Sequence, residues 1–123
     1  MGRSLTEFYS NLLHKYDGWD RVAPLLEVLP ELEAEINRHG LHRFTSHEIL
    51  RISPNAENPI HADLISIVPD KCGMARVFFQ KKDDVDKVMV LFGNGGTLME
   101  YKNLTSTLSP HFKKLAETKN HPT

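Results

Sequence analysis

The sequence predicts an α+β fold in one domain that spans residues 1–123. Apolar residues recur at helical spacing in the N-terminal third of the chain, and β-branched and aromatic residues dominate the short runs that follow. A helical pattern then returns near the C-terminus. We therefore expect two or three N-terminal helices within about 4–40, a four- to five-stranded antiparallel sheet within about 42–102, and a C-terminal helix at about 107–118.

The first predicted helix covers about 5–16. Ser4 and Glu7 stand three residues apart and form a capping box, which marks a helix start. The apolar residues that follow fall on one stripe of a 3.6-residue repeat, and they are Leu5, Phe8, Tyr9, Leu12, Leu13 and Tyr16.

A second helical region covers about 20–39. Its apolar stripe consists of Leu25, Leu26, Leu29, Leu32 and Ile36. Pro30 has no N–H to donate within a helix, so we expect a break or kink near Leu29 and Pro30. Gly40 is expected to end the segment, because glycine is favoured just after a helix.

The stretch 41–53 can be read in two ways. Apolar residues at alternate positions favour a strand, although polar residues interrupt the alternation. Thr45 and Glu48 form a second capping box, which would instead start a short helix. We favour the strand, and the helix stays open as the alternative.

Four candidate strands follow, at 61–68, 74–81, 86–93 and 97–101. The links between them are short, and the last contains Asn94-Gly95, a strong hairpin signal. Short links favour an antiparallel meander. Strands that are apolar on both faces need cover on both faces, which we expect from the C-terminal helix or from an interface with another chain.

The charge and cysteine content narrow the function classes. Fifteen basic residues oppose 16 acidic ones, for a net charge of −1, so a nucleic-acid partner is not expected. Cys72 is the one cysteine, and it lies in a predicted turn without a second thiol. The N-terminus lacks an apolar signal core and no apolar run approaches 18 residues, so we expect a cytoplasmic protein without membrane contact.

The sequence offers no motif that is specific for catalysis or for a metal. His39, His42 and His47 lie close together, but their spacing matches no zinc pattern, and solvated histidines are the simpler interpretation. His61 and Asp63 share a strand face, but no nucleophile motif accompanies them. The glycines between 93 and 96 suit a hairpin better than a phosphate loop. We therefore expect no catalytic residue, no metal and no cofactor.

A line of carboxylates is the feature that favours a function. Glu27, Glu31 and Glu35 stand at i, i+4 and i+8 of the second helix, and Glu33 adds to their density. Like charges at this spacing repel, so the line is either a solvated face or an acidic patch for a basic partner. We predict a small non-catalytic protein-binding domain, such as an inhibitor or immunity-type neutraliser of a basic protein. Reversing Glu27, Glu31 and Glu35 to Lys is expected to preserve folding.

A ribonuclease is one alternative. Arg76-Val77-Phe78-Phe79, followed by the run from Lys87 to Gly93, is similar to the toxin family called RelE-like. That resemblance covers about 25 residues and implies RNA cleavage. Its implied phosphate-binding residues are Arg76, Lys81, Lys82 and Lys87, and its implied acid–base residue is His61 or His111. Members of that family are strongly basic, whereas this chain is not.

A homodimer is the other alternative. It would bind a small molecule or a second copy of the chain through the second apolar face of the sheet.

Overall fold

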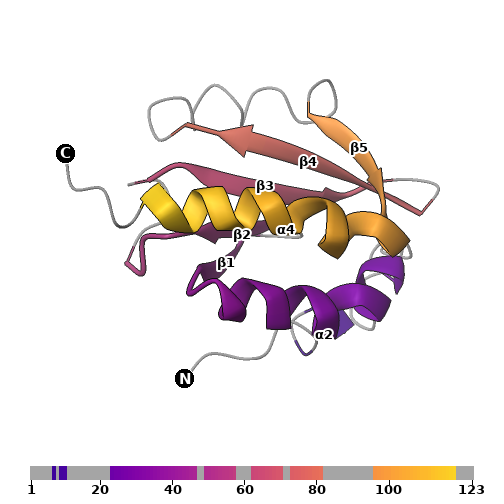
Figure 1. Ribbon diagram of the computed structural model, residues 1–123. Coiled ribbons are helices and arrows are strands. Elements are labelled where there is room, and N and C mark those ends of the chain that lie inside the picture. Colours follow the sequence, from indigo (N-terminus) through magenta and orange to yellow (C-terminus); the bar gives the residue numbers. More distant parts are fainter. Residues whose placement is uncertain are drawn as a thin grey trace.

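The computed structural model describes residues 7, 9–10, 23–46, 49–57, 62–70, 73–81 and 96–118. The elements, in chain order, are α2 (Ala23–Arg38), β1 (His42–Ser46), β2 (Ile49–Ser53), β3 (Leu64–Pro69), β4 (Met74–Gln80), β5 (Thr97–Glu100) and α4 (Tyr101–Thr118). The strands form one antiparallel sheet in the order β1-β2-β3-β4-β5, and both helices pack side by side on one face of it (Figure 1). The predicted α+β class and meander are confirmed.

The described residues contain one N-terminal helix, α2, where two or three were predicted. Of the predicted helix at 5–16, the residues Glu7, Tyr9 and Ser10 are described, and they are helical. Tyr9 is fully buried in the main core. The other residues of that predicted helix lie outside the described ranges.

A break or kink was predicted near Pro30; helix α2 runs continuously through this residue, so a break is wrong. A proline inside a helix costs about 3 kcal/mol, because one hydrogen bond is lost and the ring crowds the preceding turn. Four side chains of α2 are fully buried, and they are Leu25, Leu29, Leu32 and Ile36. Each such burial contributes about 1.5–3 kcal/mol, so together they exceed the cost of the proline.

Gly40 ends α2 as predicted. Its φ of 69° lies in the left-handed region that glycine tolerates best. The Gly40 N–H donates to the Asn37 carbonyl (3.0 Å), and the Leu41 N–H donates to the Ile36 carbonyl (3.1 Å). This pair of bonds is a Schellman motif, and the buried side chains of Leu41 and Ile36 complete it.

The stretch 41–53 forms two strands rather than one, and the short-helix alternative is wrong. Strands β1 and β2 pair antiparallel, with Arg43 opposite Ile52 and Thr45 opposite Leu50. Leu50 and Ile52 are fully buried on the face that the helices cover. The imperfect alternation in the sequence arises because β1 contributes mainly polar side chains to that face.

Strand β4 pairs directly with β5. The predicted meander placed 86–93 next to β4. In the structure Thr97–Glu100 lies there instead, and 86–93 lies outside the described residues. Gly96 enters β5 with a φ of 78°, and a Cβ there would lie 2.7 Å from the Val77 carbonyl oxygen. This position accepts only glycine without displacement of the β4 backbone.

Helix α4 begins at Tyr101, directly after β5 and six residues before the predicted start at 107. It also continues through an internal proline, Pro110. The whole helix presents one buried stripe to the sheet and α2, and this stripe consists of Tyr101, Leu104, Leu108, Phe112 and Leu115. The buried residues before position 107 therefore follow the same helical spacing as those in the predicted helix at about 107–118.

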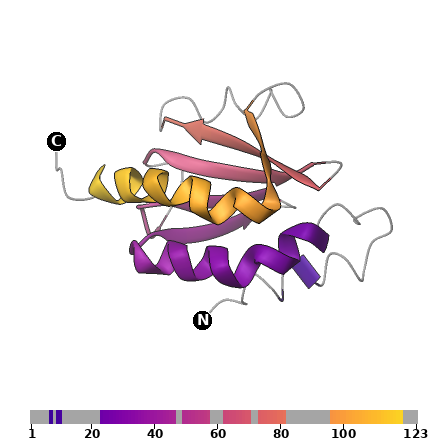
Figure 2. The same ribbon diagram turned by 45° about the vertical axis from the view of Figure 1, so that its right-hand side comes forward.

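Both faces of the central strands are buried within the single chain. Ile65, Ile67 and Val77 face the helices, whereas Leu64 and Phe78 are buried on the opposite face. The C-terminal helix or an interface with another chain was expected to cover that second face, and Figures 1 and 2 show the C-terminal helix on the same face as α2. Within the described ranges, no helix combines the length and the apolar character needed to cross a membrane.

Candidate functional site

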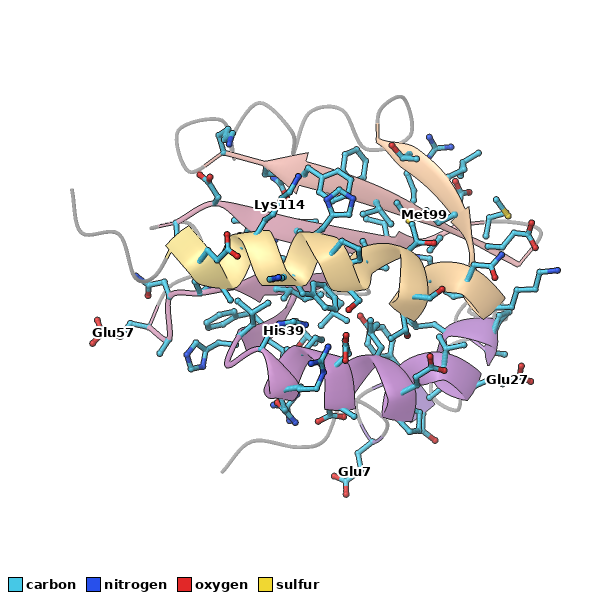
Figure 3. The ribbon with its side chains drawn as sticks, in the orientation of Figure 1. Glu7, Glu27, His39, Glu57, Met99 and Lys114 are labelled. Atoms are coloured by element: carbon cyan, nitrogen blue, oxygen red, sulfur yellow. The ribbon has the colours of Figure 1, made fainter. Side chains whose placement is uncertain are left out.

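The four glutamates that the sequence singled out on α2 lie in different environments. Glu27 and Glu31 are exposed, and no hydrogen bond or ion pair within the described part of the chain involves either carboxylate. Figure 3 shows Glu27 pointing away from the body of the molecule near one end of α2. Glu33 and Glu35 instead bind neighbouring side chains. The expected line of four free carboxylates is therefore reduced to two.

Glu35 is the centre of a polar cluster between the two helices. Its two carboxylate oxygens each accept a hydrogen bond from the Arg38 guanidinium at 2.8 Å, and the Ser109 hydroxyl of α4 donates to Oε2. His39 Nε2 lies 3.5 Å from the same oxygen. The hydrogen bonds from Arg38 and Ser109 lower the pKa of the Glu35 carboxyl from 4.5 to about 2. Glu35 therefore joins α2 to α4.

Glu33 has a similar structural role on the other side of α2. Its Oε1 lies 3.0 Å from Nη2 of Arg43 on β1, and both side chains are partly buried. This ion pair connects the helix to the edge of the sheet. The negative charge of Glu33 is thereby compensated within the chain.

A groove runs between α2 and α4 beside Glu31. The residues that line it are Glu31, Ala34, Glu35 and Arg38 from α2, and Thr105, Ser106 and Ser109 from α4. Thr105 is only 8% exposed, and its Oγ1 has no hydrogen-bond partner among the described residues. A buried hydroxyl without a partner costs free energy. The groove therefore offers the exposed carboxylate of Glu31, whereas the Thr105 oxygen is buried and out of reach of solvent.

The α4 side of this groove was not predicted from the sequence. Thr105 and Ser106 precede the predicted start of the C-terminal helix, so neither was placed on a helix. The helical periodicity of the buried stripe from Tyr101 onwards could have placed them there. No local pattern, however, shows that α4 packs beside α2, because that proximity is a property of the whole fold.

The histidine cluster has a structural explanation in part. His39 packs edge-on against Phe112, with ring centroids 6.3 Å apart, and Figure 3 shows it between the two helices. His42 lies on β1, and His47 lies outside the described residues, as do Cys72 and His61. Within the described ranges, no group of three or more potential ligands could hold a metal ion.

The residues implied by the toxin resemblance are only partly brought together. Lys81 and His111 line the same small cavity at one end of β4. Arg76 lies five positions away along the chain, where its guanidinium binds Asp70 at 2.9–3.0 Å. Lys82 and Lys87 lie outside the described residues.

Comparison of the chain with protein-family models, with curated proteins and with solved structures finds no match.

Proposed function

We propose that this chain is a non-catalytic binding protein that docks a basic segment of a partner protein on its α2–α4 face. In this proposal the chain acts in the reducing cytoplasm as an inhibitor or neutraliser of that partner. The docking face is defined by Glu27, Glu31 and the groove between the helices.

The charges of this face support a basic partner. Glu27 and Glu31 stand one helical turn apart, and both are exposed. Two uncompensated carboxylates at this distance raise the local negative potential, which speeds the encounter with a cationic surface and disfavours an acidic one. The other two glutamates add no free charge, because Arg38 and Arg43 bind them.

The exposed carboxylate of Glu31 on the wall of the groove is the observation that carries the proposal. A lysine or arginine side chain of the partner would offer only donors, and the Glu31 carboxylate is an acceptor that no described residue binds. Placing that side chain in the groove would pair the exposed carboxylate.

The test is a charge reversal with a matched control. The double variant Glu27→Lys with Glu31→Lys alters the proposed face, whereas Glu57→Lys with Glu117→Lys changes the net charge equally at exposed sites elsewhere. Each form is used as bait in a lysate of the source organism, and captured proteins are quantified by mass spectrometry. The affinity of the main captured protein is then measured by calorimetry at rising salt.

The proposal expects a basic protein that the wild type and the control variant retain and that the Glu27/Glu31 variant loses. Its affinity for the double variant should fall at least about tenfold, and that for the wild type should weaken as salt rises. Equal retention by the two double variants would contradict the proposal, as would an acidic captured protein.

A further inference from the structure

A second cavity lies on the other side of α4, between that helix and the ends of β3 and β4. It has a volume of about 190 Å³. Its apolar floor includes Ile65 and Leu115, and its rim carries Lys81, His111 and Lys114. Figure 3 shows Lys114 on the side of α4 that faces β3 and β4, away from α2.

The aromatic ring of Phe79 forms one wall of this cavity. Phe79 lies opposite Ile65 on the face that the helices cover, yet it is 48% exposed. Its ring lies against the imidazole of His111, with centroids 4.6 Å apart and planes tilted by 40°. Leaving half of a phenyl ring in water forfeits hydrophobic stabilisation, so an exposed ring in a concave site suits a planar ligand.

The rim of the cavity is cationic although the chain as a whole is not. Lys81 lies 3.3 Å from the Asp63 carboxylate, which compensates its charge in part. Lys114 is exposed, and the described residues include no ion-pair partner for it. The imidazole of His111 lines the same cavity. An anionic group at the rim would therefore meet two ammonium groups and an imidazole.

We propose that this cavity binds a nucleotide, with the base stacked on Phe79 and the phosphate held by Lys114 and Lys81. The volume admits one planar base and leaves the sugar and phosphate at the rim, where the cations lie. Stacking on an aromatic ring and charge-assisted hydrogen bonds to phosphate are the two interactions that these residues supply. The site is separate from the α2–α4 groove, so this proposal stands or fails independently of the proposed partner.

The test is an NMR titration of the full chain, followed through the aromatic signals of Phe79 and His111. The probes are adenosine 5′-monophosphate, adenosine, inorganic phosphate and a single-stranded oligoadenylate. We expect saturable shifts of both rings with the monophosphate, weaker binding of adenosine, and no ring shift with phosphate alone. Tighter binding of the oligoadenylate than of the monophosphate would identify an RNA strand as the source of the nucleotide, and equal binding would identify a free nucleotide.

Matched variants separate the two interactions. Phe79→Ala should weaken binding of the monophosphate about tenfold. Leu98→Ala alters another large hydrophobic side chain that is 48% exposed, and it should not weaken this binding. Lys114→Gln should weaken binding of the monophosphate but not binding of adenosine. Lys113→Gln, at the neighbouring exposed position, should change neither affinity. Lys114 is exposed, so its variant keeps the test valid if Phe79→Ala fails to fold. An absence of saturable ring shifts, or equal effects of Lys113→Gln and Lys114→Gln, would overturn the proposal.

Discussion

The two sides of α4 carry opposite chemistry. The groove toward α2 is lined by two carboxylates, one guanidinium and three hydroxyl side chains, whereas the cavity toward β3 and β4 is lined by two ammonium groups, one carboxylate, an imidazole and an exposed phenyl ring. The charged residues that line the groove sum to −1 and those that line the cavity sum to +1, within a chain whose net charge is −1. A near-neutral chain can therefore still carry a small anion site on one side of a helix.

Glu31 and Glu35 show the same contrast on a smaller scale. They stand one turn apart on α2 and line the same groove. Glu31 is exposed, while Glu35 accepts hydrogen bonds from Arg38 and Ser109. Spacing places two residues on one face of a helix, but the neighbouring element decides which of them binds within the chain and which stays exposed.

Charge reversal at these two sites should give the largest difference. Glu35→Lys places a cation beside Arg38 and removes the Ser109 bond, so it should lower the free energy of unfolding by about 2–3 kcal/mol. Glu31→Lys should change it by less than about 0.5 kcal/mol. Urea denaturation of the two variants measures both values. Equal stabilities would show that the Glu35 cluster does not join the helices. The expectation from the sequence, that reversal of Glu27, Glu31 and Glu35 to Lys preserves folding, would then hold.

A smaller effect should appear in the pH dependence of stability. The pKa of Glu35 is lowered from 4.5 to about 2 in the folded chain, so the unfolded chain binds the proton more readily. The stabilisation from this carboxylate is therefore complete above about pH 5 and is lost as the pH falls toward 2. Relative to wild type, Glu35→Gln should be less stable by about 1–2 kcal/mol near neutral pH, and this difference should vanish near pH 2. A difference that stays constant over this range would contradict the assigned pKa.

The local signals of the sequence predicted much of the sheet and one helix end. The strands near 61–68 and 74–81 and the segment after Gly96 occur as β3, β4 and β5. Gly40 ends α2 because a left-handed residue there satisfies two carbonyls. These features depend on residue type and short-range spacing, which a sequence states directly.

The errors arose where tertiary packing overrides a local rule. Pro30 lies inside a helix, because buried side chains on both sides of the proline hold the helix in place. The candidate site has the same limit. Glu27 and Glu31 are exposed as the helical pattern implied, but Ser109 meets Glu35 across 74 positions of sequence, and no periodicity predicts that contact. The Phe79 cavity likewise brings together two strands and a helix.

Removal of the buried hydroxyl should affect stability but not binding. Thr105→Val keeps the shape of the side chain but replaces the unsatisfied oxygen, so it should raise the free energy of unfolding by about 1 kcal/mol. The same variant should leave the affinity for the basic partner unchanged, because the buried oxygen cannot be reached from the groove. Thr107→Val, at an exposed site on α4, is the control. Loss of stability in Thr105→Val would show that its hydroxyl is satisfied in the folded chain.

The smallest expected effect concerns the cationic side of α4. Asp63→Asn removes the one carboxylate that lines the cavity and leaves Lys81 uncompensated. Binding of adenosine 5′-monophosphate should then tighten about threefold, because an exposed charge contributes less than about 1 kcal/mol, while binding of adenosine should not change. Glu31→Gln alters the groove on the other side of α4, and it should leave both affinities unchanged. If Glu31→Gln tightened the monophosphate as much as Asp63→Asn did, the ligand would be responding to the net charge of the chain, and the two sides of α4 would not be electrostatically distinct.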